Sequence, residues 1–290
     1  MSARIETALS AALDRIGRDA PPTLSAALRH AVFPGGARVR PRLCLAVAMA
    51  CGDDRPALAD AAGCAIELLH CASLVHDDLP CFDDAATRRG LPSVHAAFGQ
   101  PLAVLVGDGL ILHSFDVIAH EGVRDPARAV CLLSLLASAG GASNGLVAGQ
   151  AWESETSPPL ASYHRAKTGS LFRAAAAMGA VAAGADAAPW FALGDALGDA
   201  YQVADDLLDA AGTSAEAGKP IGQDTTHLRP SAVTVLGIDG CLDRFESLVV
   251  DARAAVPPCA GADGLRALVE QIATHLVPQA LRRDLRQRAA

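Results

Sequence analysis

A long apolar helix pattern occupies residues 58–79 and stops at Pro80, and similar patterns follow one another along most of the chain. The segment 2–18 has apolar side chains on one helical stripe: Ile5, Leu9, Ala12, Leu13 and Ile16. No segment has a convincing strand pattern. Aromatic residues make up only 4% of the chain, and the 51% that is hydrophobic is largely Ala, Leu and Val, which favours packed helices. We therefore expect an all-α fold.

The remaining helices are expected between loops that carry Gly, Pro and polar residues. Their predicted ranges are 24–32, 42–49, 102–118, 127–139, 143–153, 160–183 and 190–210, with three more helices toward the C-terminus. Residues 84–93 are expected to form a polar loop and residues 211–231 a mobile loop. No linker is long enough to divide the chain, so we expect a single domain over residues 1–290.

The net charge and the cysteine pattern limit which functions and compartments fit the chain. Lys and Arg number 24 and Asp and Glu 32, a net charge of −8 that argues against general nucleic-acid binding. The first residues lack a signal peptide, and the eight cysteines form no C-x-x-C pair, so we expect reduced thiols and a cytoplasmic protein. The two longest nearly uncharged stretches, 131–150 and 174–185, are interrupted or too short for a membrane span, which needs about 20 apolar residues.

Two aspartate clusters interrupt apolar helices. Asp205 and Asp209 are four residues apart and share one helix face, whereas Asp77 and Asp83 are six apart and need a chain bend at Pro80 to meet. Repulsion between like charges is tolerated when a cation neutralises them, and carboxylate oxygens suit Mg²⁺. One such cluster could equally be a solvated helix end. Two clusters, each following an apolar helix, favour metal binding.

Several cationic and polar residues accompany these clusters as candidate ligands for an anionic substrate. They are Arg40, His70, Arg88, Arg89, Lys167, Gln202 and Lys219. Each also has a purely structural interpretation. His70 could be a core histidine, Lys167 could extend its stem along apolar surface, and Gln202 could satisfy a buried polar group.

Five motifs in a fixed order resemble those of the trans-prenyl diphosphate synthases. They are Phe-Pro-Gly-Gly-Ala-Arg-Val-Arg-Pro at 33–41, the run 76–90 ending in Arg-Arg-Gly, Lys-Thr-Gly at 167–169, Tyr-Gln-Val-Ala-Asp-Asp-Leu-Leu-Asp at 201–209, and 218–224. The resemblance covers roughly residues 30 to 230. Within the family, the chain most resembles the short-chain bacterial geranylgeranyl diphosphate synthases of carotenoid and bacteriochlorophyll pathways.

The resemblance implies a helical bundle around a central cavity (the isoprenoid synthase fold), a homodimer, and about three Mg²⁺ ions. It implies condensation of isopentenyl diphosphate with dimethylallyl, geranyl or farnesyl diphosphate. The implied roles are metal binding by Asp77, Asp83, Asp205 and Asp209; allylic diphosphate binding by Arg88, Lys167 and Lys219; isopentenyl diphosphate binding by Arg40, His70 and Arg89; and contact with the reacting carbons, and so catalysis, by Thr168 and Gln202 with Lys167.

The product tail is expected to grow along the helix that carries Asp77, toward its N-terminal turns, so the residues there should set the product length. Ala72 and Ser73 are small, and the absence of a bulky aromatic residue at Ala72 favours a C20 product over C15, which stays open. The sequence also departs from the family, because Ala37 stands where Lys is usual. The loss of one charge-assisted contact of about 1.5–3 kcal/mol would weaken isopentenyl diphosphate binding, with Arg38 as a candidate substitute.

Other functions compete with this hypothesis. Ala37 motivates a non-catalytic subunit of a heteromeric synthase, although the aspartates are intact. His76-Asp77 motivates a metal-dependent phosphohydrolase, which leaves the Asp205 cluster unexplained. A terpene cyclase would not require Arg40 or Arg89.

Overall fold

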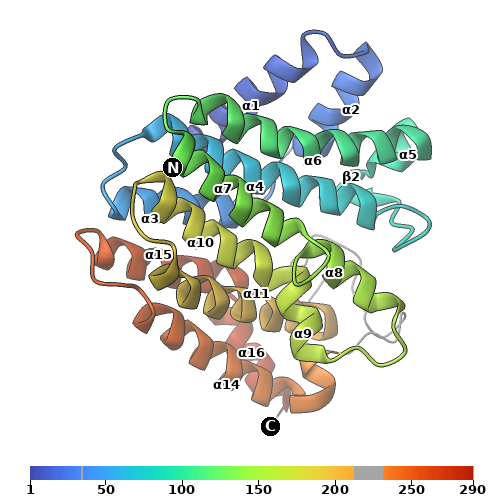
Figure 1. Cartoon of the computed structure of the whole chain (residues 1–290). Helices are drawn as coiled ribbons and strands as arrows, with labels where there is room; N and C mark the ends of the chain where they lie inside the picture. The colour runs from blue at the N-terminus through green and yellow to red at the C-terminus, as the bar shows by residue number, and fades with distance from the viewer. Residues whose placement is uncertain (34, 212–230, 290) are drawn as a thin grey trace. The chain divides into compact units, whose positions relative to one another are not determined.

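The computed structural model describes residues 1–33, 35–211 and 231–289, and in these ranges only one two-stranded hairpin accompanies the helices (Figure 1). The all-α expectation is confirmed. The chain divides into two compact units. The first unit comprises Met1–Ala137 and Met178–Asp186, and the second comprises Ser138–Ala177 and Ala187–Ala290. The single domain over residues 1–290 stays a prediction.

The first unit contains the elements of the N-terminal half. They are α1 (Ser2–Gly17), α2 (Pro22–Val32), α3 (Val39–Ala50), α4 (Pro56–Asp77), β1 (Thr87–Arg88), β2 (Leu91–Pro92), α5 (Val94–Phe98), α6 (Gln100–Gly122) and the start of α7 (Pro126–Gly140). The expected loop at 84–93 is wrong in one detail, because it holds the antiparallel hairpin that pairs Thr87 with Pro92.

Proline and apolar periodicity set these helices. Pro22, Pro56 and Pro126 begin α2, α4 and α7, where a missing backbone N–H has no helical partner to lose. The helix expected from residue 42 begins earlier, at Val39, with Pro41 still inside its first turn. Ile5 of α1 is fully buried, as its stripe predicts.

Helix α4 forms the core of the first unit and lies alongside α6 (Figure 1). Contact is close because Gly107 of α6 faces the His76 imidazole, where a Cβ would lie 1.9 Å from Nε2. By length and composition alone both helices could cross a membrane, and 78% of the apolar window of α4 and 39% of that of α6 are buried. Burial of α4 is typical of a core helix, and the expected absence of a membrane span stays a prediction.

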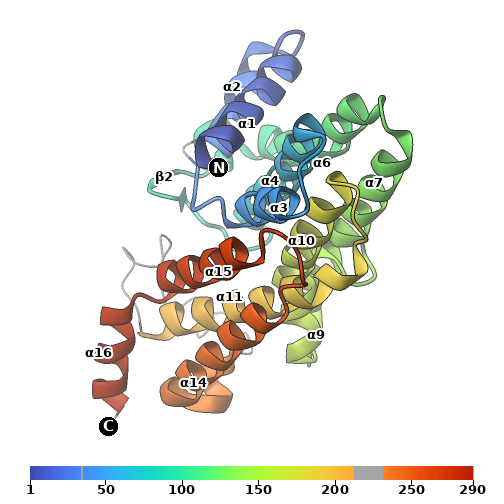
Figure 2. The same cartoon turned by 90° about the vertical axis from the view of Figure 1, so that its left-hand side faces the viewer.

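The second unit contains the helices after α7. They are α8 (Leu146–Ala151), the 3-10 turn η1 (Trp152–Ser154), α9 (Leu160–His164), the π-helix η2 (Arg165–Gly169), the start of α10 (Ser170–Ala182), η3 (Ala188–Trp190), α11 (Phe191–Ala211), α14 (Ala232–Ala254), α15 (Ala262–Leu276) and α16 (Gln279–Ala289). The predicted helix 160–183 is therefore helical throughout but contains a π-turn. Helices α11 and α14 pack side by side (Figure 2).

Candidate active site

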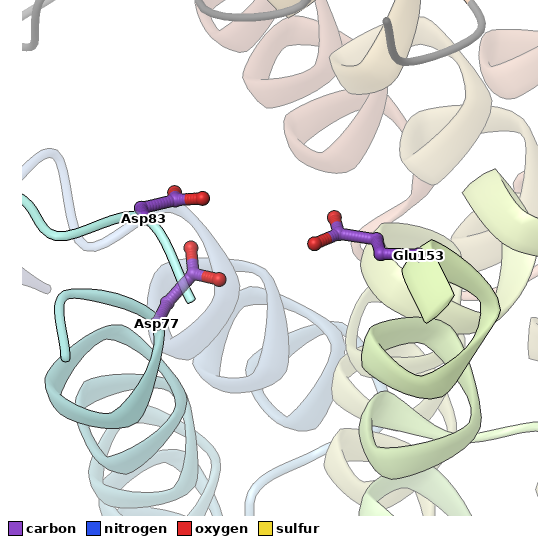
Figure 3. A group of neighbouring side chains, drawn as sticks. All are labelled: Asp77, Asp83 and Glu153. Atoms are coloured by element: carbon purple, nitrogen blue, oxygen red, sulfur yellow. The ribbon is translucent and has the colours of Figure 1, made fainter. Parts of the chain in front are cut away.

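The first aspartate cluster lies where α4 ends and the chain turns back on itself. The backbone N–H of Asp83 donates to the carbonyl of Asp77 (3.0 Å), and that of Ala85 donates to the carbonyl of Asp78 (3.1 Å). Carboxylate oxygens of Asp77 and Asp83 consequently lie within 4.8 Å of each other, and Figure 3 shows Asp77 at the helix end and Asp83 on the following turn. The bend that the sequence required near Pro80 is confirmed.

The adjacent Asp78 has a different environment from Asp77. Its side chain is buried, with the residue 2% exposed, and its two carboxylate oxygens accept hydrogen bonds from Nε of Arg88 at 3.0 and 3.2 Å. Burial raises the pKa of Asp78, while the Arg88 guanidinium opposes the rise. Asp78 thus holds Arg88, and with it strand β1, against the aspartate turn. This role of Asp78 was not predicted from the sequence.

Arg40, His70 and Arg89 gather within the first unit. Nη1 of Arg40 lies 3.4 Å from Nε2 of His70, and Arg89 packs over Gly36, where a Cβ would lie 2.9 Å from the guanidinium. Burial, followed by the charges of Arg40 and Arg89, lowers the pKa of His70 well below its usual range. His70 is therefore neutral, which allows its ring nitrogen to accept from Arg40.

Arg38 does not replace the lysine that is missing at Ala37. Its side chain is buried and donates to Glu67 (2.6 Å), to Glu6 (2.8 Å) and to the carbonyl of Val32 (2.9 Å). Burial disfavours the charge, but the hydrogen bonds and the Glu67 carboxylate outweigh it and raise the pKa of Arg38. The suggestion that Arg38 contacts a substrate is wrong, because the guanidinium is committed to the core while Ala37 is exposed.

Ala72 and Ser73 lie one turn below Asp77 on α4. Ala72 is 1% exposed, so any larger side chain there would displace its neighbours. The Ser73 hydroxyl donates a hydrogen bond to the carbonyl of His70 (2.8 Å), so its proton has a partner within α4.

Lys167 lies in the π-helix η2 of the second unit, where its ammonium pairs with Glu153. The same carboxylate accepts from the Tyr163 hydroxyl (2.7 Å) and from Nε2 of Gln150 (2.9 Å). Glu153, the third side chain in Figure 3, was missed at the sequence level. The available signal was a carboxylate that ends an apolar segment, as in both aspartate clusters.

Thr168, Gln202 and the second aspartate cluster are connected by hydrogen bonds. The Thr168 hydroxyl donates to Oε1 of Gln202 (2.7 Å), and Nε2 of Gln202 donates to Oδ1 of Asp206 (2.8 Å). Asp205 and Asp209 lie one turn apart on α11, half-buried and buried respectively. Lys219 and most of the predicted loop 211–231 lie outside the described residues.

Comparison with known proteins identifies the family. The profile of the polyprenyl synthetase family matches residues 21–250. The chain belongs to this family. The resemblance drawn from the five motifs is thereby confirmed.

Individual members of the polyprenyl synthetase family match nearly the whole chain. A geranylgeranyl diphosphate synthase of Cereibacter sphaeroides is 53% identical over 276 residues, covering 95% of this chain and 96% of its own. A farnesyl diphosphate synthase of Geobacillus stearothermophilus is 37% identical, with coverages of 83% and 84%. The crystal structure of a farnesyl/geranylfarnesyl diphosphate synthase (FPP/GFPP synthase) from Zymomonas mobilis is 31% identical, with a TM-score of 0.76 and coverages of 94% and 100%. The isoprenoid synthase fold is confirmed.

Members of this family use divalent metal, and the donor set here fits it. Asp77 and Asp83 offer carboxylate oxygens, which are hard ligands suited to Mg²⁺ and unsuited to soft metals.

Proposed function

We propose that this protein condenses isopentenyl diphosphate with an allylic diphosphate, in the presence of Mg²⁺, to make a trans-prenyl diphosphate, chiefly the C20 geranylgeranyl diphosphate. The observation that carries the proposal is the 53% identity to a geranylgeranyl diphosphate synthase over nearly the full chain, against 37% to a farnesyl diphosphate synthase. A C15 product is the alternative.

The aspartates would bind the metal ions, and the cationic side chains would bind the diphosphate. Asp77 and Asp83 would hold two Mg²⁺ ions, and Asp205 would hold a third with help from Asp209. Bound Mg²⁺ neutralises the charge that grows on the diphosphate as it leaves the allylic carbon. Arg88, Lys167 and Lys219 would add positive charge to the same group, and such charges are worth most where water is excluded.

The second substrate would bind at Arg40, His70 and Arg89. Neutral His70 accepts from Arg40 and adds no positive charge, so the arginines supply the attraction for the isopentenyl diphosphate. Thr168 and Gln202 would lie beside the reacting carbons, and holding the double bond in place is a positioning task.

Product length would be limited by α4 below Asp77. The small size of Ala72 supports a long tail, so Ala72→Phe should shorten the main product by at least one C5 unit. Chromatographic sizing of the dephosphorylated product measures this. An active variant with unchanged product length would contradict the assignment of Ala72 and Ser73 to the cavity floor.

The protein would act as a homodimer in the cytoplasm, without nucleic acid and without a membrane span. Helix α6 supports the dimer, because one of its faces exposes Val104, Leu105 and Leu112, the last with 70% of its surface open. All eight cysteines lie among the described residues and no disulfide joins any two of them, which agrees with a reducing compartment.

The direct test is incorporation of labelled isopentenyl diphosphate with each allylic starter in turn, in the presence of Mg²⁺. Wild type should give prenyl products, and Asp77→Asn should reduce the rate at least about 100-fold. Asp263→Asn changes a fully exposed carboxylate on α15 and should leave the rate unchanged. Absence of product from every starter would defeat the proposal. Activity of the purified chain alone would eliminate the non-catalytic subunit, and phosphate release without elongation would favour the phosphohydrolase.

A further inference from the structure

Asp206 is the buried member of the second aspartate pair, with the residue 1% exposed. Its two oxygens accept from different parts of the second unit. Oδ1 accepts from Nε2 of Gln202 (2.8 Å), and Oδ2 accepts from the backbone N–H of Ala232 (2.7 Å), the first residue of α14. The carboxylate therefore connects a side chain of α11 to the start of α14.

These contacts fix the direction of the neighbouring hydrogen bonds. A carboxylate only accepts hydrogen bonds, so Gln202 must turn its NH₂ group toward Asp206 and its carbonyl oxygen toward Thr168. The Thr168 hydroxyl has one proton and donates it to that oxygen (2.7 Å). With its proton directed at Gln202, the Thr168 hydroxyl can present only its lone pairs to a substrate.

We propose that Asp206 is a positioning residue that sets this direction, so that Thr168 presents electron density rather than a hydrogen to the positively charged allylic carbon. The inference rests on the proposed function, in which that carbon becomes cationic as the diphosphate leaves. An oriented acceptor stabilises the developing positive charge at no cost of reorientation. Asp206 touches neither substrate and acts through Gln202 and Thr168.

Asp206→Asn tests the direction with little change of shape. The N–H of Ala232 still needs an acceptor, so the new amide turns its oxygen to Ala232 and its NH₂ group to Gln202. Gln202 must then rotate its amide, donate to Thr168 and turn the Thr168 proton outward. We expect kcat to fall about 10- to 100-fold, with unchanged KM values and an unchanged Mg²⁺ concentration at half-maximal rate.

Two further variants separate this role from a structural one. Ser231→Ala removes the Ser231 hydroxyl that accepts from Val233 N–H at the start of α14 (3.2 Å) and leaves Gln202 untouched, so kcat should stay within about twofold. Thr168→Val removes the oxygen on which Asp206 acts. Combining it with Asp206→Asn should therefore reduce kcat no further than Thr168→Val alone, because the two changes remove one interaction.

The inference is overturned if Asp206→Asn keeps the wild-type kcat or raises the Mg²⁺ concentration needed for half-maximal rate. It is also overturned if the fold-reduction in kcat of the double variant equals the product of the reductions in Asp206→Asn and Thr168→Val. An equal loss in Ser231→Ala would also overturn it, since the effect would then come from the start of α14. Wild type without any prenyl product would instead defeat the proposed function, which keeps the two failures distinct.

Discussion

Each aspartate pair splits into one outward and one inward residue. Asp77 and Asp205 are partly exposed, whereas Asp78 and Asp206 are 2% and 1% exposed. The inward residues hold Arg88 and the start of α14 through charge-assisted hydrogen bonds. Each aspartate motif therefore contains both a candidate metal ligand and a buried residue that holds a neighbouring segment in place.

His70 should make stability depend on pH. Its folded pKa lies well below the usual range because of burial and the nearby arginines, so below about pH 6.5 the unfolded chain binds a proton that the folded chain does not. This contribution to the unfolding free energy is complete above about pH 6.5 and is lost as pH falls below it, by about 1.4 kcal/mol per pH unit. Urea unfolding of wild type and His70→Gln should therefore converge or cross as pH is lowered to 5.5.

The control for this prediction is His275→Gln, which changes an exposed histidine of α15 and should follow wild type at every pH. A constant difference between wild type and His70→Gln from pH 5.5 to 7.5 would show that folded His70 titrates normally.

Ala37→Lys should restore a substrate contact. Ala37 is exposed, and Arg38 is committed to Glu6 and Glu67 and supplies no charge there. A new ammonium should lower KM for isopentenyl diphosphate about tenfold and leave that for the allylic substrate unchanged. Initial-rate kinetics measure both, with Ala57→Lys as the control at an exposed alanine of α4. Equal effects of the two substitutions would indicate attraction by net charge alone.

At the scale of elements, the π-helix η2 places Lys167 and Thr168. Two glycines let neighbouring helices approach it, since a Cβ on Gly149 of α8 would lie 2.4 Å from the Lys167 backbone and one on Gly198 of α11 would lie 2.7 Å from Cα of Gly169. The extra residue of a π-turn changes which side chains face these helices, and such turns are frequent at functional sites.

Gly149→Ala should therefore displace η2. The methyl group meets backbone atoms that cannot rotate away, so we expect a loss of about 1–3 kcal/mol of unfolding free energy together with reduced kcat. Gly264→Ala on α15 is the matched control. Apart from the adjoining backbone of α15 itself, no atom of the described residues lies within 4 Å of its new Cβ, and the higher helix propensity of Ala should add up to about 1 kcal/mol. Urea unfolding that ranks Gly149→Ala at or above wild type would contradict close packing of α8 on η2.

At the scale of the whole molecule, the exposed face of α6 is expected to form the dimer contact. Leu112→Glu places a charge at its most exposed leucine and should shift wild-type dimers toward monomers in sedimentation velocity at micromolar concentration. Val250→Glu on α14, with Val250 62% exposed, is the control and should remain dimeric. A wild-type protein that sediments as a monomer would refute the proposed homodimer.

Most of the helices and the turn that brings Asp77 and Asp83 together were predictable because they depend on local features. Apolar residues at helical spacing, proline at helix starts and the turn after Asp77 act over a few positions of chain. The π-turn at Lys167 and the short hairpin at Thr87 were missed, since each depends on packing that local periodicity does not encode.

The sequence alone determined an all-α chain with two aspartate clusters and the cations of a prenyl synthase. Only the tertiary structure decided that Arg38 pairs with Glu67, that Glu153 pairs with Lys167, and that the side chains of Asp78 and Asp206 are buried. The physical reason is that a helix repeat gives the face on which a side chain lies, whereas its partner comes from another segment. Burial then decides the outcome, because a charge removed from water must find an opposite charge or a hydrogen bond.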